Sequence, residues 1–113
     1  MVSAKMTAEI KRCYEALTDK RIDIHKYSGP LFDVVFEIIT ADTFVAGVAS
    51  KLLDRDPVTR EERNIISAQM LLEGRLWRLD NGQLFDLQAH AEIKEIAMTI
   101  ETLRAKCNEA LVS

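Results

Sequence analysis

Residues 57–87, PVTREERNIISAQMLLEGRLWRLDNGQLFDL, decide which fold the sequence favours. Thr59 and Glu62 match a capping box, in which each side chain accepts a hydrogen bond from the other residue's backbone amide. We therefore expect a helix to begin at Thr59. The end of this helix is open, because Asn81-Gly82 suits either a tight hairpin turn or a helix C-cap.

In one interpretation the helix stops at Gly74 and residues 76–87 form a β-hairpin around Asn81-Gly82. A two-residue loop would place Leu79 opposite Leu84 and Trp77 opposite Asp86. Each strand face would then mix three apolar residues with one charged residue, so neither face is clearly the core face.

A helix pair followed by such a hairpin resembles the winged-helix family, over roughly residues 42–87. The resemblance implies a DNA-binding regulator with Arg75 and Arg78 on the wing. The charge of this region argues against that function, because residues 42–87 carry six basic and eight acidic side chains. A protein that binds in a DNA groove usually has a clear positive excess.

In the other interpretation, which we favour, one helix continues through Gly74 to Asp80, and Asn81-Gly82 caps it. At 100° per residue the apolar side chains collect on one face, with a flanking strip, and the polar side chains collect on another. The apolar face holds Ile65, Ala68, Leu72, Leu76 and Leu79; the strip holds Ile66, Met70 and Trp77; the polar face holds Arg60, Arg63, Asn64, Ser67, Arg75 and Arg78.

This polar face is either a solvated surface, balanced by nearby glutamates, or a docking surface for an acidic partner. Trp77 lies beside it and is either a core residue or an interface anchor, since tryptophan is enriched among binding hot spots. The candidate partner-binding residues are Arg60, Arg63, Asn64, Arg75, Trp77 and Arg78.

The rest of the chain also favours helices, and we expect about five in an all-α bundle. Apolar residues recur at helical spacing over about residues 4–20, where Met6, Ile10, Cys13 and Leu17 form one stripe. Residues 31–39 predict a central helix buried on most sides. Residues 41–43 are expected to break this helix and to supply the capping residue of a separate helix, over about residues 43–54.

Two features of these helices allow a second reading. Asp33 and Glu37 lie four apart, which suits a wet edge of the central helix or a carboxylate pair for acid–base or metal chemistry. No histidine or third ligand accompanies them at a suitable spacing, so we favour the wet edge. Gly47 indicates close packing of another backbone, or a contact with a ligand beside it.

The C-terminal segment, from about Gln88 to Leu111, is the most regular helix in the sequence. Its apolar residues follow at three-four spacing, as in a coiled coil. Such a seam can pack on the N-terminal stripe or pair with a second subunit, and in so small a domain we expect some of both. Its candidate dimer residues are Ile93, Ile96, Ile100, Leu103 and Cys107, and the outward charges include a Glu101–Arg104 pair.

Composition limits the remaining possibilities. The chain has 113 residues, 48% hydrophobic and 29% charged, with a net charge of −3, which indicates one globular domain over residues 1–113 rather than disorder. No apolar run is long enough for a signal peptide or a membrane span, so we expect a cytoplasmic protein. Two cysteines, both on apolar stripes, are typical of buried inert thiols.

No catalytic, metal-binding or cofactor motif is present in the sequence, so we expect no catalytic residues, no metal and no cofactor. The sequence thus predicts a non-enzymatic regulatory, adaptor or chaperone-like domain that binds a protein partner through helical surfaces, as a homodimer. The alternatives are the DNA-binding regulator and a small helical enzyme or ligand-binding protein with a pocket beside Gly47.

Overall fold

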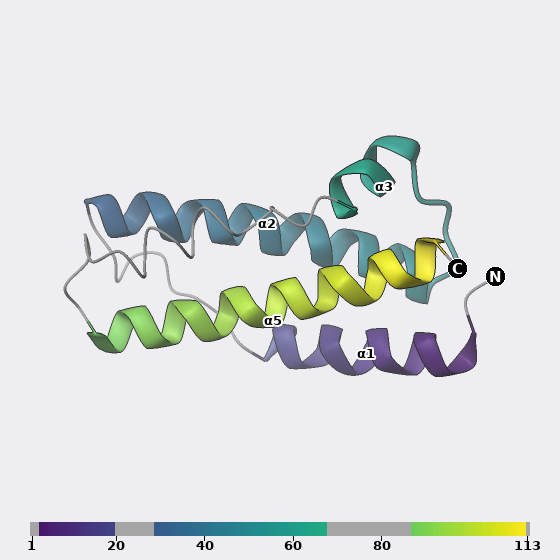
Figure 1. The fold of residues 1–113 in the computed structure, drawn as a ribbon, viewed down its shortest axis with the longest axis horizontal. Helices are drawn as coiled ribbons and strands as arrows, with labels where there is room; N and C mark the ends of the chain where they lie inside the picture. Colours follow the sequence, from purple (N-terminus) through teal and green to yellow (C-terminus); the bar gives the residue numbers. More distant parts are fainter. Residues whose placement is uncertain (1–2, 20–28, 68–86, 113) are drawn as a thin grey trace.

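The computed structural model describes residues 3–19, 29–67 and 87–112, and all of their regular secondary structure is helical. Figure 1 shows the four helices: α1 (Ala4–Thr18), α2 (Pro30–Leu53), α3 (Arg60–Ile66) and α5 (Leu87–Val112). The all-α fold expected from the sequence is confirmed. Among these helices none is long and apolar enough to cross a membrane.

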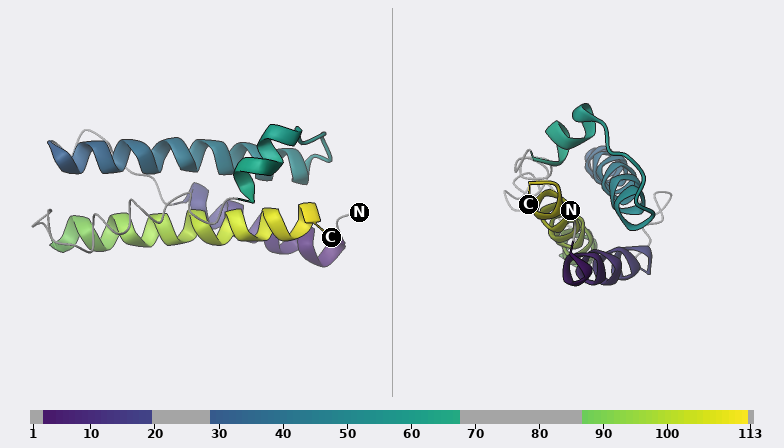
Figure 2. Two further views of the ribbon diagram at one scale, coloured as in Figure 1. Left: turned by 45° about the horizontal axis from the view of Figure 1, so that its top comes forward. Right: turned by 90° about the vertical axis from the view of Figure 1, so that its right-hand side faces the viewer.

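The two long helices, α2 and α5, lie side by side and run in the same direction, while α1 runs antiparallel to them (Figure 1). The helix α5 packs against each of the other three, and the short α3 crosses above the C-terminal halves of α2 and α5 (Figure 2). The first turn of α1 and the last turn of α5 therefore lie near the same end of the molecule.

The apolar stripes of the sequence meet in one core. Ile10 and Leu17 of α1 are buried, with Met6, Cys13 and Tyr14 packed beside them. The core also takes the inner face of α2, one residue of α3 and the seam of α5: Val35, Ile38, Ala41, Val45, Val48, Ala49, Ile66, Ile93, Ile96, Ala97, Ile100, Leu103, Cys107 and Ala110. Burial of these side chains is the main source of stability.

The expected break at residues 41–43 is wrong, because α2 is one continuous helix of 24 residues. Thr43 does not cap a new helix, and its hydroxyl donates to the carbonyl of Ile39 at 3.0 Å within the same helix. Thr40 likewise donates to Phe36 at 2.9 Å. A threonine hydroxyl can bond the carbonyl four residues back, so a threonine in a pattern does not by itself mark a boundary.

The capping box is confirmed, since the Thr59 hydroxyl accepts from the Glu62 amide at 3.1 Å and Glu62 accepts from the Thr59 amide at 3.0 Å. The helix it starts is shorter than either interpretation predicted, because α3 ends at Ile66 and Ser67 lies in a turn. The choice between helix and hairpin after that point concerns residues 76–87, nearly all of which lie outside the described residues.

The predicted core face of α3 is also wrong by one position. Ile66 is fully buried, whereas Ile65, placed on the apolar face by the long-helix interpretation, is exposed. The orientation of α3 about its own axis is set by two hydrogen bonds to neighbouring helices. One is accepted by the Glu62 carboxylate and the other by the Ile66 carbonyl. These two contacts turn Ile65 outward.

Candidate functional site

The helix α3 is held against both long helices by charged side chains. On one side, the Lys51 ammonium of α2 lies 2.7 Å from the Glu62 carboxylate. On the other, Arg104 of α5 donates a hydrogen bond to the Ile66 carbonyl at the C-terminal end of α3. A cation at this end of a helix also opposes the negative end of the helix dipole.

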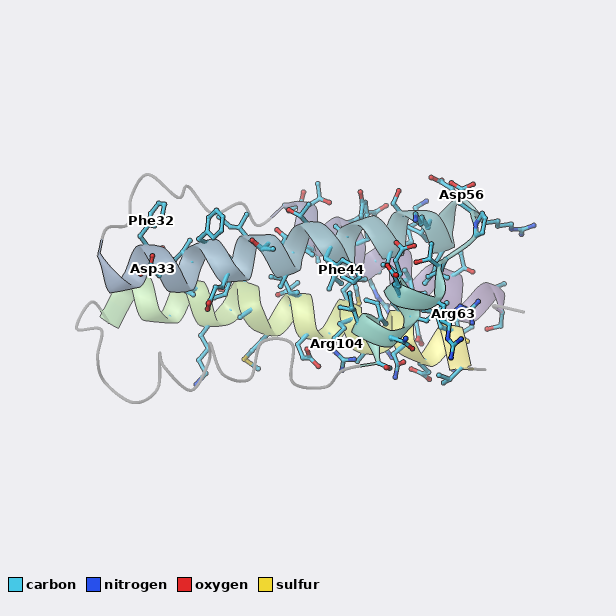
Figure 3. All side chains as sticks on the ribbon, turned by 90° about the horizontal axis from the view of Figure 1, so that it is seen from above. Phe32, Asp33, Phe44, Asp56, Arg63 and Arg104 are labelled. Atoms are coloured by element: carbon cyan, nitrogen blue, oxygen red, sulfur yellow. The ribbon has the colours of Figure 1, made fainter. Side chains whose placement is uncertain are left out.

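Arg104 differs from its expected place on the wet side of α5, because its side chain is buried and only 4% of the residue is exposed. Its Nε donates to Glu101 Oε1 at 2.7 Å, and its second amino group pairs with the same oxygen. Figure 3 shows Arg104 beside α3. The Glu101–Arg104 pair predicted from the sequence is present, but it lies at a helix–helix contact rather than on the surface.

With α3 fixed in this way, three of the six candidate partner-binding residues share its outer face. Arg60, Arg63 and Asn64 are all exposed, and neither guanidinium has an ion-pair partner within the described parts of the chain. Figure 3 shows Arg63 on the outer side of α3. The other three candidates, Arg75, Trp77 and Arg78, lie outside the described residues.

The net charge on the outer face of α3 depends on whether the Glu62 carboxylate is neutralised by another residue. The Lys51 pair, with the Thr59 hydrogen bonds, lowers the pKa of the Glu62 carboxyl to about 2, so it is ionised and neutralised by Lys51. Glu61 remains as the exposed acidic residue of the helix. The outer face of α3 therefore presents two arginines that have no ion-pair partner among the described residues, beside one exposed carboxylate.

A second surface lies on α2, where five exposed residues without charge follow one another at helical spacing. We call these the outer row: Phe32, Phe36, Thr40, Thr43 and Gly47. The rings of Phe32 and Phe36 stack with their centres 6.4 Å apart, and Phe36 is 56% exposed. The side of α2 that carries Phe32 faces away from α5 (Figure 3).

The threonines do not make this surface polar, because both hydroxyls bond carbonyls of the same helix. The outer row thus presents aromatic rings at one end and small side chains at the other. The prediction that residues 31–39 are buried on most sides is wrong, since only Val35 and Ile38 of the described side chains in that range are fully buried.

The close packing that the sequence suggested at Gly47 is not found among the described residues. A Cβ atom added at Gly47 would find nothing within 4 Å. The residue is exposed, and no other described segment approaches it. Close packing therefore does not explain its place on α2 within residues 3–19, 29–67 and 87–112.

The candidate dimer seam of α5 lies inside the molecule. Ile93, Ile100, Leu103 and Cys107 are fully buried and Ile96 is nearly so, against the core residues of α1 and α2. The seam packs within the chain, so these five side chains are not available to a second subunit in this fold.

Burial explains the raised pKa values of two further groups, Cys107 and Asp42. Burial, with a smaller effect of nearby Cys13, raises the pKa of the Cys107 thiol to about 12, which keeps it protonated and unreactive near neutral pH. Burial also raises the pKa of Asp42. Asp33 is exposed, and no group of three or more histidine, cysteine, aspartate or glutamate side chains within residues 3–19, 29–67 and 87–112 lies close enough to hold a metal ion.

Comparisons of the chain with protein-family models, with curated proteins and with solved structures found no match. The fold and the two exposed surfaces are therefore the basis for a functional conclusion.

Sequence reasoning missed the outer row, although a signal for it exists. The five residues follow at spacings of four, four, three and four, which is one face of a helix. The row crosses residues 41–43, where a break was expected, so it is recognised only when α2 is treated as continuous.

Proposed function

We propose that this chain is a cytoplasmic, non-enzymatic regulatory, adaptor or chaperone-like domain that acts through its helical surfaces as a homodimer. In this proposal the outer face of α3 binds an acidic protein partner through Arg60, Arg63 and Asn64. Arginine suits this role because its planar guanidinium pairs with carboxylates in a bidentate geometry.

The observation that carries the proposal is the way α3 is fixed while its cations stay unpaired. Lys51 and Arg104 hold α3 from two sides, and Arg60 and Arg63 project outward without an ion pair among the described residues. Because α3 is already held from two sides, binding of a partner does not have to order its backbone, which favours recognition.

The test compares two charge-reversal variants in the host cell by crosslinking and mass spectrometry. One variant carries Arg60→Glu and Arg63→Glu on α3. The control carries Lys5→Glu and Lys11→Glu, two exposed residues of α1, and changes the net charge by the same amount. We expect a defined set of acidic protein partners to be lost from the α3 variant and retained by the control.

Two results would contradict this function. If both variants lose the same partners, the net charge rather than α3 determines binding. If the α3 variant instead loses binding to duplex DNA that weakens steeply with salt, the partner is nucleic acid and the protein is a DNA-binding regulator.

A further inference from the structure

We propose that the outer row of α2 binds a second copy of this chain, with the two α2 helices antiparallel across a two-fold axis between Ile39 and Thr40. This inference rests on the homodimer of the proposed function and assigns the surface that forms it. The seam of α5 cannot do so, because its side chains are buried within the chain.

The first argument is the match of sizes along the outer row. Phe36 and Thr43 lie at equal distances from the point between Ile39 and Thr40, and so do Phe32 and Gly47. A two-fold axis there places each phenylalanine opposite a small residue of the second copy. The open space over Gly47, where no described atom lies within 4 Å of an added Cβ, then receives the ring of Phe32.

The second argument is charge, and it concerns the direction of pairing. A parallel pair would bring the exposed Asp33 of one copy against Asp33 of the other, and like charges repel. An antiparallel pair separates the two carboxylates by about 20 Å along the helix axis. Charge therefore favours the antiparallel arrangement.

The third argument is that the outer row faces no other described helix. Figure 2 shows α1, α3 and α5 grouped on the other sides of α2, and Phe32 points away from α3 and α5 in Figure 3. A continuous row of five exposed uncharged residues that includes a stacked aromatic pair is unusual on a solvated helix face. Most soluble oligomers are symmetric assemblies of identical copies, and two-fold dimers are the commonest of them.

The size of the surface sets the strength of the contact. The outer row spans about 22 Å of helix and is one helix wide, about 10 Å. This footprint is smaller than the roughly 800 Å² per partner of a standard stable interface. We therefore expect a weak dimer, with a dissociation constant in the micromolar range.

The main test is sedimentation equilibrium of the full chain over a range of concentrations. We expect Phe36→Asp to raise the dimer dissociation constant by at least about tenfold. Met98→Asp is the matched control, since Met98 of α5 is also 56% exposed, and it should leave the constant unchanged. Gly47→Glu provides a second blocking variant that adds a side chain where the structure has room, so the fold is retained.

The direction of pairing is tested by disulfide crosslinking in a Cys13→Ser background. Thr40→Cys lies next to the axis and should crosslink two copies on oxidation. Gly47→Cys should not, because antiparallel pairing separates the two residues by about 22 Å, far beyond the roughly 7 Å that a disulfide allows. Parallel pairing would crosslink both variants and would overturn the proposed arrangement.

The remaining outcomes are also decisive. A chain that stays monomeric at high micromolar concentration overturns the dimer, while the α3 crosslinking experiment still decides whether an acidic partner binds. A dimer that Met98→Asp disrupts and Phe36→Asp does not would place the interface elsewhere. A wild-type monomer whose outer row binds only a different protein would replace the second copy with that protein.

Discussion

Arg104 is the one charged residue that the structure buries within its described ranges, at 4% exposed. It connects two helices at once, because it bonds the Glu101 carboxylate of α5 and the last carbonyl of α3. The sequence places Arg104 in a regular series of outward charges, and the i,i+3 spacing to Glu101 is typical of a surface pair. Its burial depends on α3, which is distant in the sequence.

We expect Arg104→Leu to lower the free energy of unfolding by about 2–3 kcal/mol, because the Ile66 carbonyl and the partly buried Glu101 carboxylate lose a charged donor. Urea unfolding measures the change. Adding Glu101→Leu should recover part of the loss, since replacing both members of a pair removes the uncompensated charge. The exposed Arg63→Leu should change stability by no more than about 0.5 kcal/mol; an equal loss in that control would refute the role of burial.

Glu62 makes the stability of α3 dependent on pH. Its pKa is lowered from 4.5 to about 2 by Lys51 and Thr59, so the ionised form is favoured in the folded state. The resulting stabilisation is complete above about pH 4.5, declines as the pH falls, and is lost near pH 2. We expect Glu62→Gln to be less stable than wild type near neutral pH, with the difference shrinking over this range. Equal acid sensitivity of the two proteins, measured by urea unfolding at each pH, would contradict the assignment.

At the scale of elements, α2 shows what a local pattern can and cannot predict. The inner face, with Val35, Ile38, Val45 and Val48, follows from helical spacing and is confirmed. The break expected near Thr43 is wrong because its hydroxyl bonds back along the helix. Because α2 is one continuous helix, Phe32, Phe36 and Gly47 lie on a single face. Two separate helices would not align these residues.

Gly47 inside α2 and Gly29 at its N-cap should respond to substitution by alanine in opposite directions. Gly47 lies in the helix with open space around it, so Gly47→Ala should stabilise the chain by up to about 1 kcal/mol. Gly29 has a φ of +62° ahead of the helix, so Gly29→Ala should destabilise it by more than about 1 kcal/mol. Thermal and urea unfolding measure both changes, and a loss of stability in Gly47→Ala would show that its environment is crowded.

At the scale of the whole molecule, the helix α5 is the shared partner of all the other described helices. Its seam was equally compatible with packing in the monomer and with pairing of subunits. The structure places the seam in the monomer core, because α1 and α2 bring complementary apolar stripes to it.

Leu103→Ala tests this assignment. Removing a fully buried side chain should lower the free energy of unfolding by about 2–5 kcal/mol. Because the contact is within one chain, the loss should be the same over about a hundredfold range of protein concentration. The exposed Met98→Ala is the control and should stay within about 0.5 kcal/mol of wild type. A loss that grows on dilution would indicate that the seam lies between subunits.

The sequence by itself determined the all-α class, the stripes of α1 and α5 and the start of α3, because helical periodicity and a capping box are local properties. The tertiary structure decided which sides of α2 and α3 are exposed, since exposure depends on which other helices pack there. Within residues 57–87 the sequence predicted correctly where α3 begins. The orientation of α3 about its axis depended on Lys51 and Arg104. Those contacts join residues far apart in the chain, and no local pattern contains them.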